Sequence, residues 1–183
     1  MAASRTGSLT VEELSRALRE TRGPEMRNRR WIAGLSLFST AVMSGIGLYQ
    51  LGIIRDIPEP PLCWFDAKKV NGSAQAYSIL KTPDALLGAM NYAATACLAG
   101  VGSPDRATTT PWIPIAMGAK LAGDALVAGK LTVDQWTKHR AFSMWCLLTA
   151  GATFAAAALG VRETAAAVRR IADEIAACAR AGR

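Results

Sequence analysis

Residues 31–54 read WIAGLSLFSTAVMSGIGLYQLGII, and none of these 24 residues carries a charge. Two further uncharged runs cover residues 85–104 and 141–161. A helix needs about 20 mostly apolar residues to cross the hydrocarbon core of a bilayer. Three such runs are difficult to bury within 183 residues. The sequence therefore favours a polytopic membrane protein over a soluble bundle of very apolar helices.

A fourth apolar segment, residues 111–131, contains Lys120 and Asp124. Because these residues are four apart, they share one face of a helix and can form an ion pair. Such a pair is tolerated inside a membrane when it faces a bundle interior, as a structural contact or as part of a proton path. We therefore predict an all-α, four-transmembrane-helix bundle, with spans at 31–54, 84–103, 111–131 and 139–161.

Composition excludes several other classes of protein. Hydrophobic residues make up 51% of the chain, which is too many for a disordered protein. The net charge of +7 could indicate nucleic-acid binding, but the arginines crowd towards the two ends and leave long stretches uncharged. His139 is the single histidine, and no cysteine cluster has zinc-ligand spacing, so we expect neither a metal site nor a nucleic-acid partner.

The distribution of lysine and arginine predicts the orientation in the membrane. With the N-terminus inside, the cytoplasmic segments carry thirteen of these residues and the outer segments carry seven. The positive-inside rule then places both termini in the cytoplasm, as expected for a multi-pass protein of the cell inner membrane.

The two ends of the chain are predicted to be amphipathic. In segment 1–30, Thr10-Val11-Glu12-Glu13 is a capping-box pattern at the start of a helix that Gly23-Pro24 ends. In segment 162–183, one stripe contains Val168, Ile171, Ile175 and Cys178. Such helices can lie on anionic lipid, or they can pack on the bundle or on a partner. Residues 31–161 form the membrane domain between them.

The loop 55–82 is the longest segment outside the membrane. It begins with three prolines, which favour extended and turn conformations, and continues with Cys63-Trp64-Phe65-Asp66. We predict a short helix at Ser73–Leu80 and an N-cap at Asp84 for the next span. With this topology, Cys63 and Cys146 share the oxidising side, so a disulfide between them is allowed by compartment. Alternatively, both are small buried hydrophobic residues.

Three stretches together resemble the vitamin K epoxide reductase family. The first is Asp66-Ala67-Lys68-Lys69-Val70-Asn71-Gly72-Ser73, followed by Ala76-Tyr77. The second is Pro83-Asp84-Ala85-Leu86-Leu87-Gly88 at the start of the second span, and the third is Ser143-Met144-Trp145-Cys146 at the outer end of the fourth. The resemblance covers roughly residues 31–161. It implies four spans that hold a quinone beside a redox disulfide, with electrons supplied by a partner thiol protein through loop cysteines.

The resemblance also implies residue roles. Cys146 corresponds to the quinone-facing cysteine of the family's Cys-x-x-Cys pair, and Ser143 stands where the first cysteine would be. Ala67 takes the place of a loop cysteine, and Cys63 lies near that region without clearly matching a family position. Asp84 stands where a polar residue hydrogen-bonds the quinone. Aromatic side chains near this depth could line the quinone site or act as interfacial anchors, namely Phe65, Tyr77 and Trp145, together with Trp64 and the neighbouring Met144.

The serine at position 143 departs from the family pattern, because a hydroxyl cannot form a disulfide. It could be an engineered trap in an active enzyme, or the mark of a natural member that lost the chemistry and kept the pocket. Cys63 and Cys146 could also form a non-standard pair. Two functions follow: a quinone-linked thiol oxidoreductase with an impaired redox pair, or a non-catalytic quinone- or lipid-binding subunit or scaffold of a membrane complex. His139 would serve as a proton donor in the first case and as a surface anchor in either.

Overall fold

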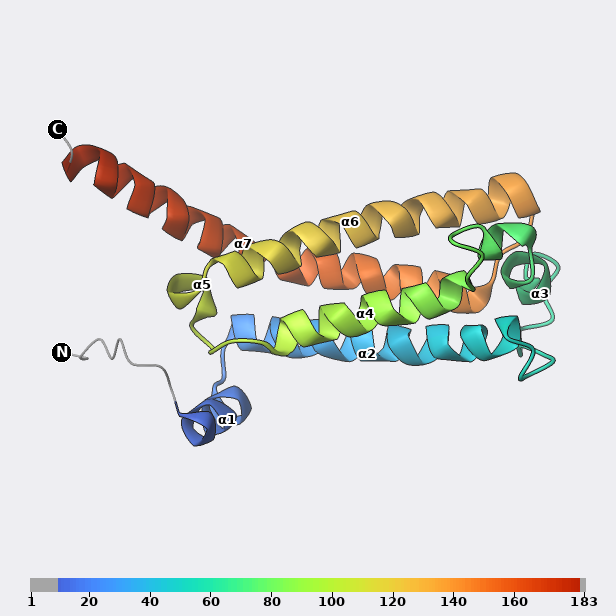
Figure 1. Ribbon diagram of the computed structural model, residues 1–183, viewed down its shortest axis with the longest axis horizontal. Helices are drawn as coiled ribbons and strands as arrows, with labels where there is room; N and C mark the ends of the chain where they lie inside the picture. The colour runs from blue at the N-terminus through green and yellow to red at the C-terminus, as the bar shows by residue number, and fades with distance from the viewer. Residues whose placement is uncertain (1–9, 182–183) are drawn as a thin grey trace.

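The computed structural model describes residues 10–181, and this part of the chain is helical. Four long helices lie side by side (Figure 1): α2 (Pro24–Gln50), α4 (Asp84–Gly100), α6 (Trp112–Asp134) and α7 (Met144–Ala181). The shorter elements are α1 (Val11–Glu20), α3 (Ala67–Asn71), the 3₁₀ turn η1 (Ala74–Tyr77), α5 (Arg106–Thr109) and the π-helical turn η2 (Gln135–His139). Within the described residues, the strand-like pairing is limited to one bridge between Phe65 and Phe142. The predicted all-α class is confirmed.

The bundle is built from two helix pairs. Helix α4 packs mainly on α2, helix α6 packs mainly on α7, and contacts between α2 and α7 join the pairs. Helices α1 and α5 and the projecting end of α7 lie at one end of the bundle, whereas α3 and the long loop lie at the opposite end (Figure 1). We call these the terminal end and the loop end.

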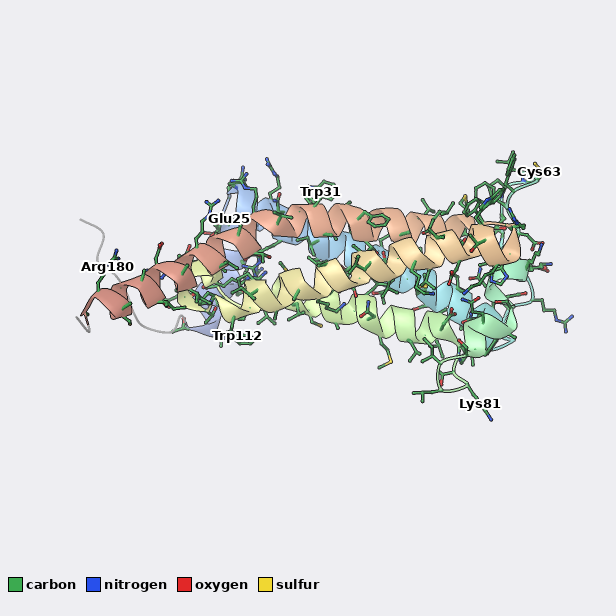
Figure 2. All side chains as sticks on the ribbon, turned by 90° about the horizontal axis from the view of Figure 1, so that it is seen from above. Glu25, Trp31, Cys63, Lys81, Trp112 and Arg180 are labelled. Atoms are coloured by element: carbon green, nitrogen blue, oxygen red, sulfur yellow. The ribbon has the colours of Figure 1, made fainter. Side chains whose placement is uncertain are left out.

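Two of the helices are long and apolar enough to cross a membrane, α2 with 27 residues and α7 with 38. Helix α4 has only 17 residues, and α6 carries Lys120 and Asp124 within its apolar stretch, so membrane crossing by these two helices stays a prediction. Exposed tryptophans lie towards both ends of the bundle: Trp31 and Trp112 towards the terminal end (Figure 2), and Trp64 beside Cys63 at the loop end. This placement is typical of side chains that anchor a protein at the two membrane interfaces.

The two amphipathic ends differ in how they join the bundle. At the N-terminal end, the predicted capping box is confirmed, since Thr10 and Glu13 exchange side chain-to-backbone hydrogen bonds. Arg30 of α2 then donates to the carbonyls of Leu18 and Thr21, which fixes the end of α1 to the start of α2. At the C-terminal end, the predicted tail is no separate helix. It continues α7 without a break and projects beyond the bundle (Figure 1).

The loop 55–82 contains less helix at Ser73–Leu80 than expected. Only Ala74–Tyr77 is helical, and Leu80 and Lys81 adopt positive φ angles of 52° and 55°, which turn the chain towards α4. Asp84 is the first residue of α4 and not its N-cap, a position that Pro83 occupies. The Asp84 carboxylate instead accepts a hydrogen bond from Nε2 of Gln50 at 2.7 Å.

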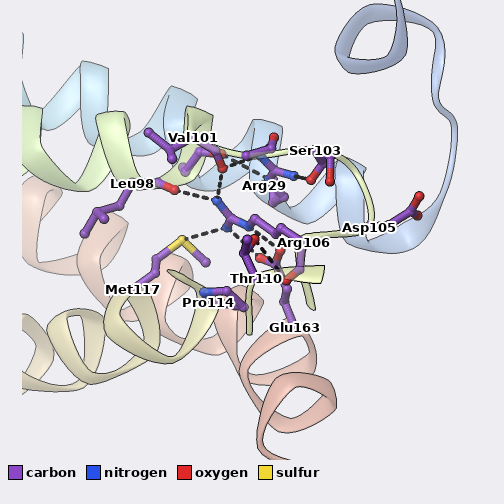
Figure 3. Close-up of polar contacts among 12 residues, drawn as sticks. Arg29, Leu98, Val101, Ser103, Asp105, Arg106, Thr110, Pro114, Met117 and Glu163 are labelled. Carbon is purple, nitrogen blue, oxygen red and sulfur yellow. Dashed lines mark hydrogen bonds and ion pairs between the residues drawn. The ribbon is translucent and has the colours of Figure 1, made fainter. Parts of the chain in front are cut away.

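A buried ion pair joins α5 to α7 at the terminal end of the bundle. Arg106 is fully buried and donates from Nε and Nη2 to the two carboxylate oxygens of Glu163, at 2.6 and 2.8 Å (Figure 3). Its Nη1 donates to the carbonyl oxygens of Leu98 and Val101 at the end of α4, each at 2.6 Å. One guanidinium thus supplies hydrogen bonds to a buried carboxylate and to two carbonyls at the end of α4 that have no partner within that helix.

A second arginine completes this end of α4. Arg29 of α2 is almost fully buried and donates to the carbonyls of Ala99 and Ser103 at 3.0 and 2.9 Å. It also donates to the carbonyls of residues 100–102. Positive charge at the C-terminal end of a helix is favourable because the helix dipole is negative there.

Close contact between α6 and α7 depends on glycine. A Cβ at Gly118 would come within 2.3 Å of Oγ1 of Thr164, and one at Gly160 would come within 2.8 Å of Leu121. The absence of a side chain at these two positions therefore lets the backbones approach each other.

We expect Glu163→Gln to lower the free energy of unfolding by about 3–5 kcal/mol, because it leaves the buried Arg106 guanidinium without a counter-charge. The measurement is thermal unfolding in a mild detergent. The matched control is Glu174→Gln, which removes a half-exposed carboxylate paired with Arg170 on the same helix and should cost about 0–1 kcal/mol. Equal losses of stability for the two variants would contradict a structural role for the buried pair.

Candidate functional site

A cavity of about 490 Å³ lies towards the loop end of the bundle, between α2, α4, α6 and α7 and beneath the loop that contains α3 and η1. Ligand pockets in proteins commonly have volumes of a few hundred Å³ and mostly apolar walls with a few polar groups. The apolar walls here include Met43, Ile46, Leu87, Val127 and Leu131. The polar lining includes Asn71, Asp84, Asn91, Tyr92, Asp124, Asp134, Gln135, His139 and Cys146.

The side-chain amide of Asn71 connects Ser143 and Cys146, the two residues for which the resemblance implied the place of a redox pair. Its Nδ2 donates to Oγ of Ser143 at 3.2 Å, and its Oδ1 accepts from Sγ of Cys146 at 3.3 Å. Ser143 is fully buried and Asn71 is nearly so. Because the two atoms of one amide contact positions 143 and 146, both side chains point to the same place at the start of α7.

Ser143 also acts at the start of a helix. It directly precedes α7, and its Oγ accepts a hydrogen bond from the backbone N–H of Cys146 at 3.5 Å, which is the N-cap pattern. Two further acceptors complete this helix start. Gln135 Oε1 accepts from the N–H of Ser143, and Glu59 Oε1 accepts from the N–H of Met144, each at 2.8 Å. Serine at position 143 therefore has a structural role that needs no sulfur chemistry.

The loop is fastened to the start of α7. Glu59 accepts hydrogen bonds from the N–H groups of both Met144 and Ala67, so one carboxylate joins the helix start to α3. The backbone of Trp64 and Asp66 pairs with Phe142 through two hydrogen bonds of 2.7 and 2.9 Å. The rings of Trp64, Trp136 and Phe142 stack with centroid distances of 5.8 and 5.6 Å. These contacts hold Cys63, which is exposed, in the segment that lies against α7.

Asp84 and Gln50 form a second polar group on the cavity wall. Gln50 is buried, and its Nε2 donates both to Asp84 and to the backbone carbonyl of Asn71, while its Oε1 accepts from the N–H of Ala85. This arrangement fixes the Asp84 carboxylate at the cavity surface between α2 and α4. A carboxylate there can accept a hydrogen bond from a ligand hydroxyl, and a protonated carboxyl can donate to a ligand carbonyl.

The predicted ion pair lies at the wall between α4 and α6. Lys120 and Asp124 are 2.6 Å apart and mostly buried, and Nζ of Lys120 also donates to the side chains of Asn91 and Thr95 of α4. Asp124 accepts from Nδ2 of Asn91 at 3.0 Å. The pair therefore faces a neighbouring helix, as predicted, and the structure favours the structural role because each charge has several partners.

The rim of the cavity carries further charge. Asp134 accepts hydrogen bonds from the ammonium groups of Lys130 and Lys138, at 2.7 and 2.8 Å, and these contacts hold the pKa of its carboxyl well below the usual range. His139 also lines the cavity. The next residue, Arg140, has a left-handed φ of 51° and lies over the ring of Trp136.

The residues that the sequence proposed for the site fall into two groups, those that line the cavity and those that hold the loop. Asp84 and Cys146 both line the cavity, whereas Phe65, Tyr77 and Trp145 are not among its lining residues. The last three hold the loop instead. Tyr77 donates to the carbonyl of Gln50, Trp145 donates to the carbonyl of Pro58, and Phe65 forms the bridge to Phe142. All four cysteines of the chain lie in the described part, and each is a free thiol.

Sequence reasoning missed Asn71, Gln50 and Glu59. Asn71 belongs to a sequence that matches a glycosylation motif, which gave no reason to expect a buried amide between positions 143 and 146. Gln50 is the single amide side chain in the run 31–54, and a buried amide needs hydrogen-bond partners, which is the signal that could have identified it. Glu59 lies among prolines in a loop, and no local pattern reveals its contact with the start of α7.

Residues 30–161 match the family model described as the vitamin K epoxide reductase family. A search of curated proteins found no significant match. The matched region contains most of α2, all of α4 and α6, the loop and the first half of α7, so it includes every residue of the site described above.

We expect Ser143→Ala to lower the free energy of unfolding by about 1 kcal/mol, because it removes an N-cap oxygen and a hydrogen-bond partner of Asn71. The measurement is thermal unfolding in detergent. Ser78→Ala is the matched control, since that exposed hydroxyl binds only a nearby carbonyl in the loop. A Ser143→Ala protein as stable as the Ser78→Ala control would show that the hydroxyl has no capping role.

Proposed function

The chain belongs to the vitamin K epoxide reductase family, and from this premise we propose that it is a quinone-binding membrane protein whose thiol–disulfide relay does not operate. The single observation that carries this proposal is the cavity wall at the start of α7. It contains one thiol, Cys146, held by Asn71 beside a fully buried Ser143 hydroxyl. The lining of the cavity supports a quinone as the ligand, whereas a disulfide between positions 143 and 146 cannot form.

The chemistry of the lining supports a quinone as the ligand. A quinone ring is flat and apolar with two carbonyl groups, so it needs an apolar slot and polar groups near its oxygens. The cavity has the necessary volume and apolar walls, and Asp84 is fixed at its surface by Gln50. The hydroxyl of Tyr92 and the imidazole of His139 are further groups that could meet a ring oxygen.

A quinone supplies two-electron redox chemistry when it is bound. In the family's reaction, the electrons come from a pair of thiols that closes to a disulfide. Cys146 alone cannot supply them, because removing two electrons from one thiol leaves no second sulfur to close the bond. The cysteine of the loop, Cys63, is exposed in a segment fastened by Glu59 and by the Trp64 stack. This fastening favours binding without turnover.

The alternative function is an oxidoreductase that uses Cys63 and Cys146 as a non-standard pair. It would accept electrons from a thiol protein on the outer face and pass them to quinone. The bridge between Phe65 and Phe142 supports this alternative, because it brings the Cys63 segment to the start of α7. The separate free thiols weigh against it. An engineered serine at position 143 in an otherwise active enzyme is the third explanation.

We also propose four spans, with both termini in the cytoplasm and the cavity near the outer face of the inner membrane. The larger number of lysine and arginine residues in the predicted inner segments supports this orientation. The common position of α1 and the end of α7 at the terminal end is consistent with it (Figure 1). In this arrangement the protein's partners are membrane lipid, quinone and, for the scaffold function, other membrane subunits.

We expect the purified protein to bind a short-chain ubiquinone or menaquinone analogue, and Asp84→Leu to weaken binding about 3- to 10-fold through loss of one hydrogen bond. Asp84→Asn should bind within about twofold of the unmodified chain, because an amide can still hydrogen-bond a ring oxygen. Equilibrium dialysis in detergent measures these affinities. Asp56→Leu changes an exposed loop carboxylate and is the matched control. No binding by the unmodified chain would overturn the proposed ligand.

We expect the unmodified chain to oxidise a dithiol donor with quinone no faster than the Cys146→Ala variant, because the redox pair lacks one sulfur. Thiol counting after denaturation without reductant should find four free thiols. Ser143→Cys should instead lose two thiols on oxidation, since Asn71 holds positions 143 and 146 together. Quinone-dependent oxidation by the unmodified chain that is lost in both Cys63→Ala and Cys146→Ala would establish the non-standard pair. Turnover restored by Ser143→Cys would identify the serine as a trap.

A further inference from the structure

Large apolar side chains are exposed along α7 at intervals of seven residues. They are Phe154 (47% exposed), Val161 (61%), Val168 (50%) and Ile175 (66%). Alanines at positions 158, 165 and 172 lie between them, so the stripe follows alternating steps of four and three residues. We call these seven residues the α7 stripe. This spacing, sustained over about three heptads, is typical of a coiled-coil seam.

The α7 stripe crosses the predicted membrane boundary. Phe154 and Val161 belong to the uncharged run 141–161, whereas Val168 and Ile175 lie among Arg169, Arg170, Asp173 and Glu174. Helix α7 is unbroken through this boundary, and residues 161–181 contain no glycine or proline that would bend it. The charged half of the helix therefore continues away from the bundle (Figure 1).

This position restricts what can cover the stripe. Lipid can cover Phe154 and Val161 but not the half that projects into water. A soluble protein can cover Val168 and Ile175 but not the half inside the membrane. The whole α7 stripe can be covered by a helix that leaves the membrane at the same depth as α7. That helix must carry apolar residues with the same seven-residue spacing. A second copy of this chain has such a helix.

We propose that two copies of the chain form a parallel dimer through the α7 stripe. Two copies inserted in one membrane have the same orientation, so their α7 helices pair in parallel and in register, with twofold symmetry. Small residues between larger ones let such helices approach closely within the membrane. The residues that flank the stripe permit the pairing. Ile171 and Cys178 flank one side, while Arg162 and Arg169 flank the other, so parallel helices bring these arginines near neutral residues.

The first test is disulfide cross-linking in native membranes, in a background where the exposed cysteines Cys63, Cys97 and Cys178 are changed to serine. Ala172→Cys lies in the stripe, and Ala177→Cys is the matched control on the opposite face of the same exposed helix. On mild oxidation, we expect about tenfold more dimer from Ala172→Cys, because only paired helices bring the two Cα atoms within about 7 Å. Equal cross-linking of the two variants, or a product with the mass of a different partner, would overturn the proposal.

The second test is the mass of the protein in lipid nanodiscs. We expect the unmodified chain to have twice the 19.3 kDa of one chain, and Ile175→Asp to be a monomer. Ala177→Asp places the same charge away from the stripe and should remain a dimer. Both positions are exposed, so neither variant disturbs the core. A monomeric unmodified chain, or a dimer that survives Ile175→Asp, contradicts pairing through this surface.

Discussion

All four long helices of the bundle meet around the buried guanidinium of Arg106. A fixed positive charge in this position requires a counter-charge, supplied by Glu163 of α7, and acceptors for its remaining N–H groups, supplied by the end of α4. Arg29 brings α2 to the same carbonyls. Three helices and the α4–α6 connection thus meet at one polar centre, and close packing of α6 on α7 at Gly118 adds the fourth. At the loop end the bundle contains its cavity, and the charged cluster of Asp134, Lys130 and Lys138 lies at the rim of that cavity.

At the loop end, neutral amides perform the corresponding task. Asn71 joins α3 to the start of α7, Gln50 joins α2 to α4 and to Asn71, and Gln135 joins the π-helical turn to Ser143. Amides both donate and accept, so each can satisfy two neighbours without a buried charge. This network holds Cys146 and Asp84 at the cavity surface. Its hydrogen bonds to position 143 involve the serine hydroxyl and backbone, so the network needs no second sulfur at that position.

The sequence predicted those features that depend on residues close together in the chain. The capping box of Thr10 and Glu13, the apolar run of α2 and the i, i+4 pair of Lys120 and Asp124 are local patterns with a direct physical meaning. The contacts that organise the site are long-range. Arg106 meets a carboxylate 57 residues away, and Asn71 meets Ser143 across 72 residues. No periodicity reveals such contacts. Phe65, Tyr77 and Trp145 do not line the cavity, and the sequence left their place open because hydrophobic character near an interface does not distinguish a cavity wall from a loop contact.

Helix α7 also has a mechanical consequence. Its 38 residues form one unbroken helix, about 57 Å long, that carries Cys146 near one end and the exposed residues of the projecting half near the other. A rod of this length cannot move at one end alone. A tilt of about 5° around the Arg106–Glu163 contact would displace its ends by a few ångströms in opposite directions, which is comparable to the width of a single side chain. A change in the position of the projecting helix therefore also changes the geometry of the cavity. A contact that holds the outer part of α7 in place also fixes the shape of the pocket.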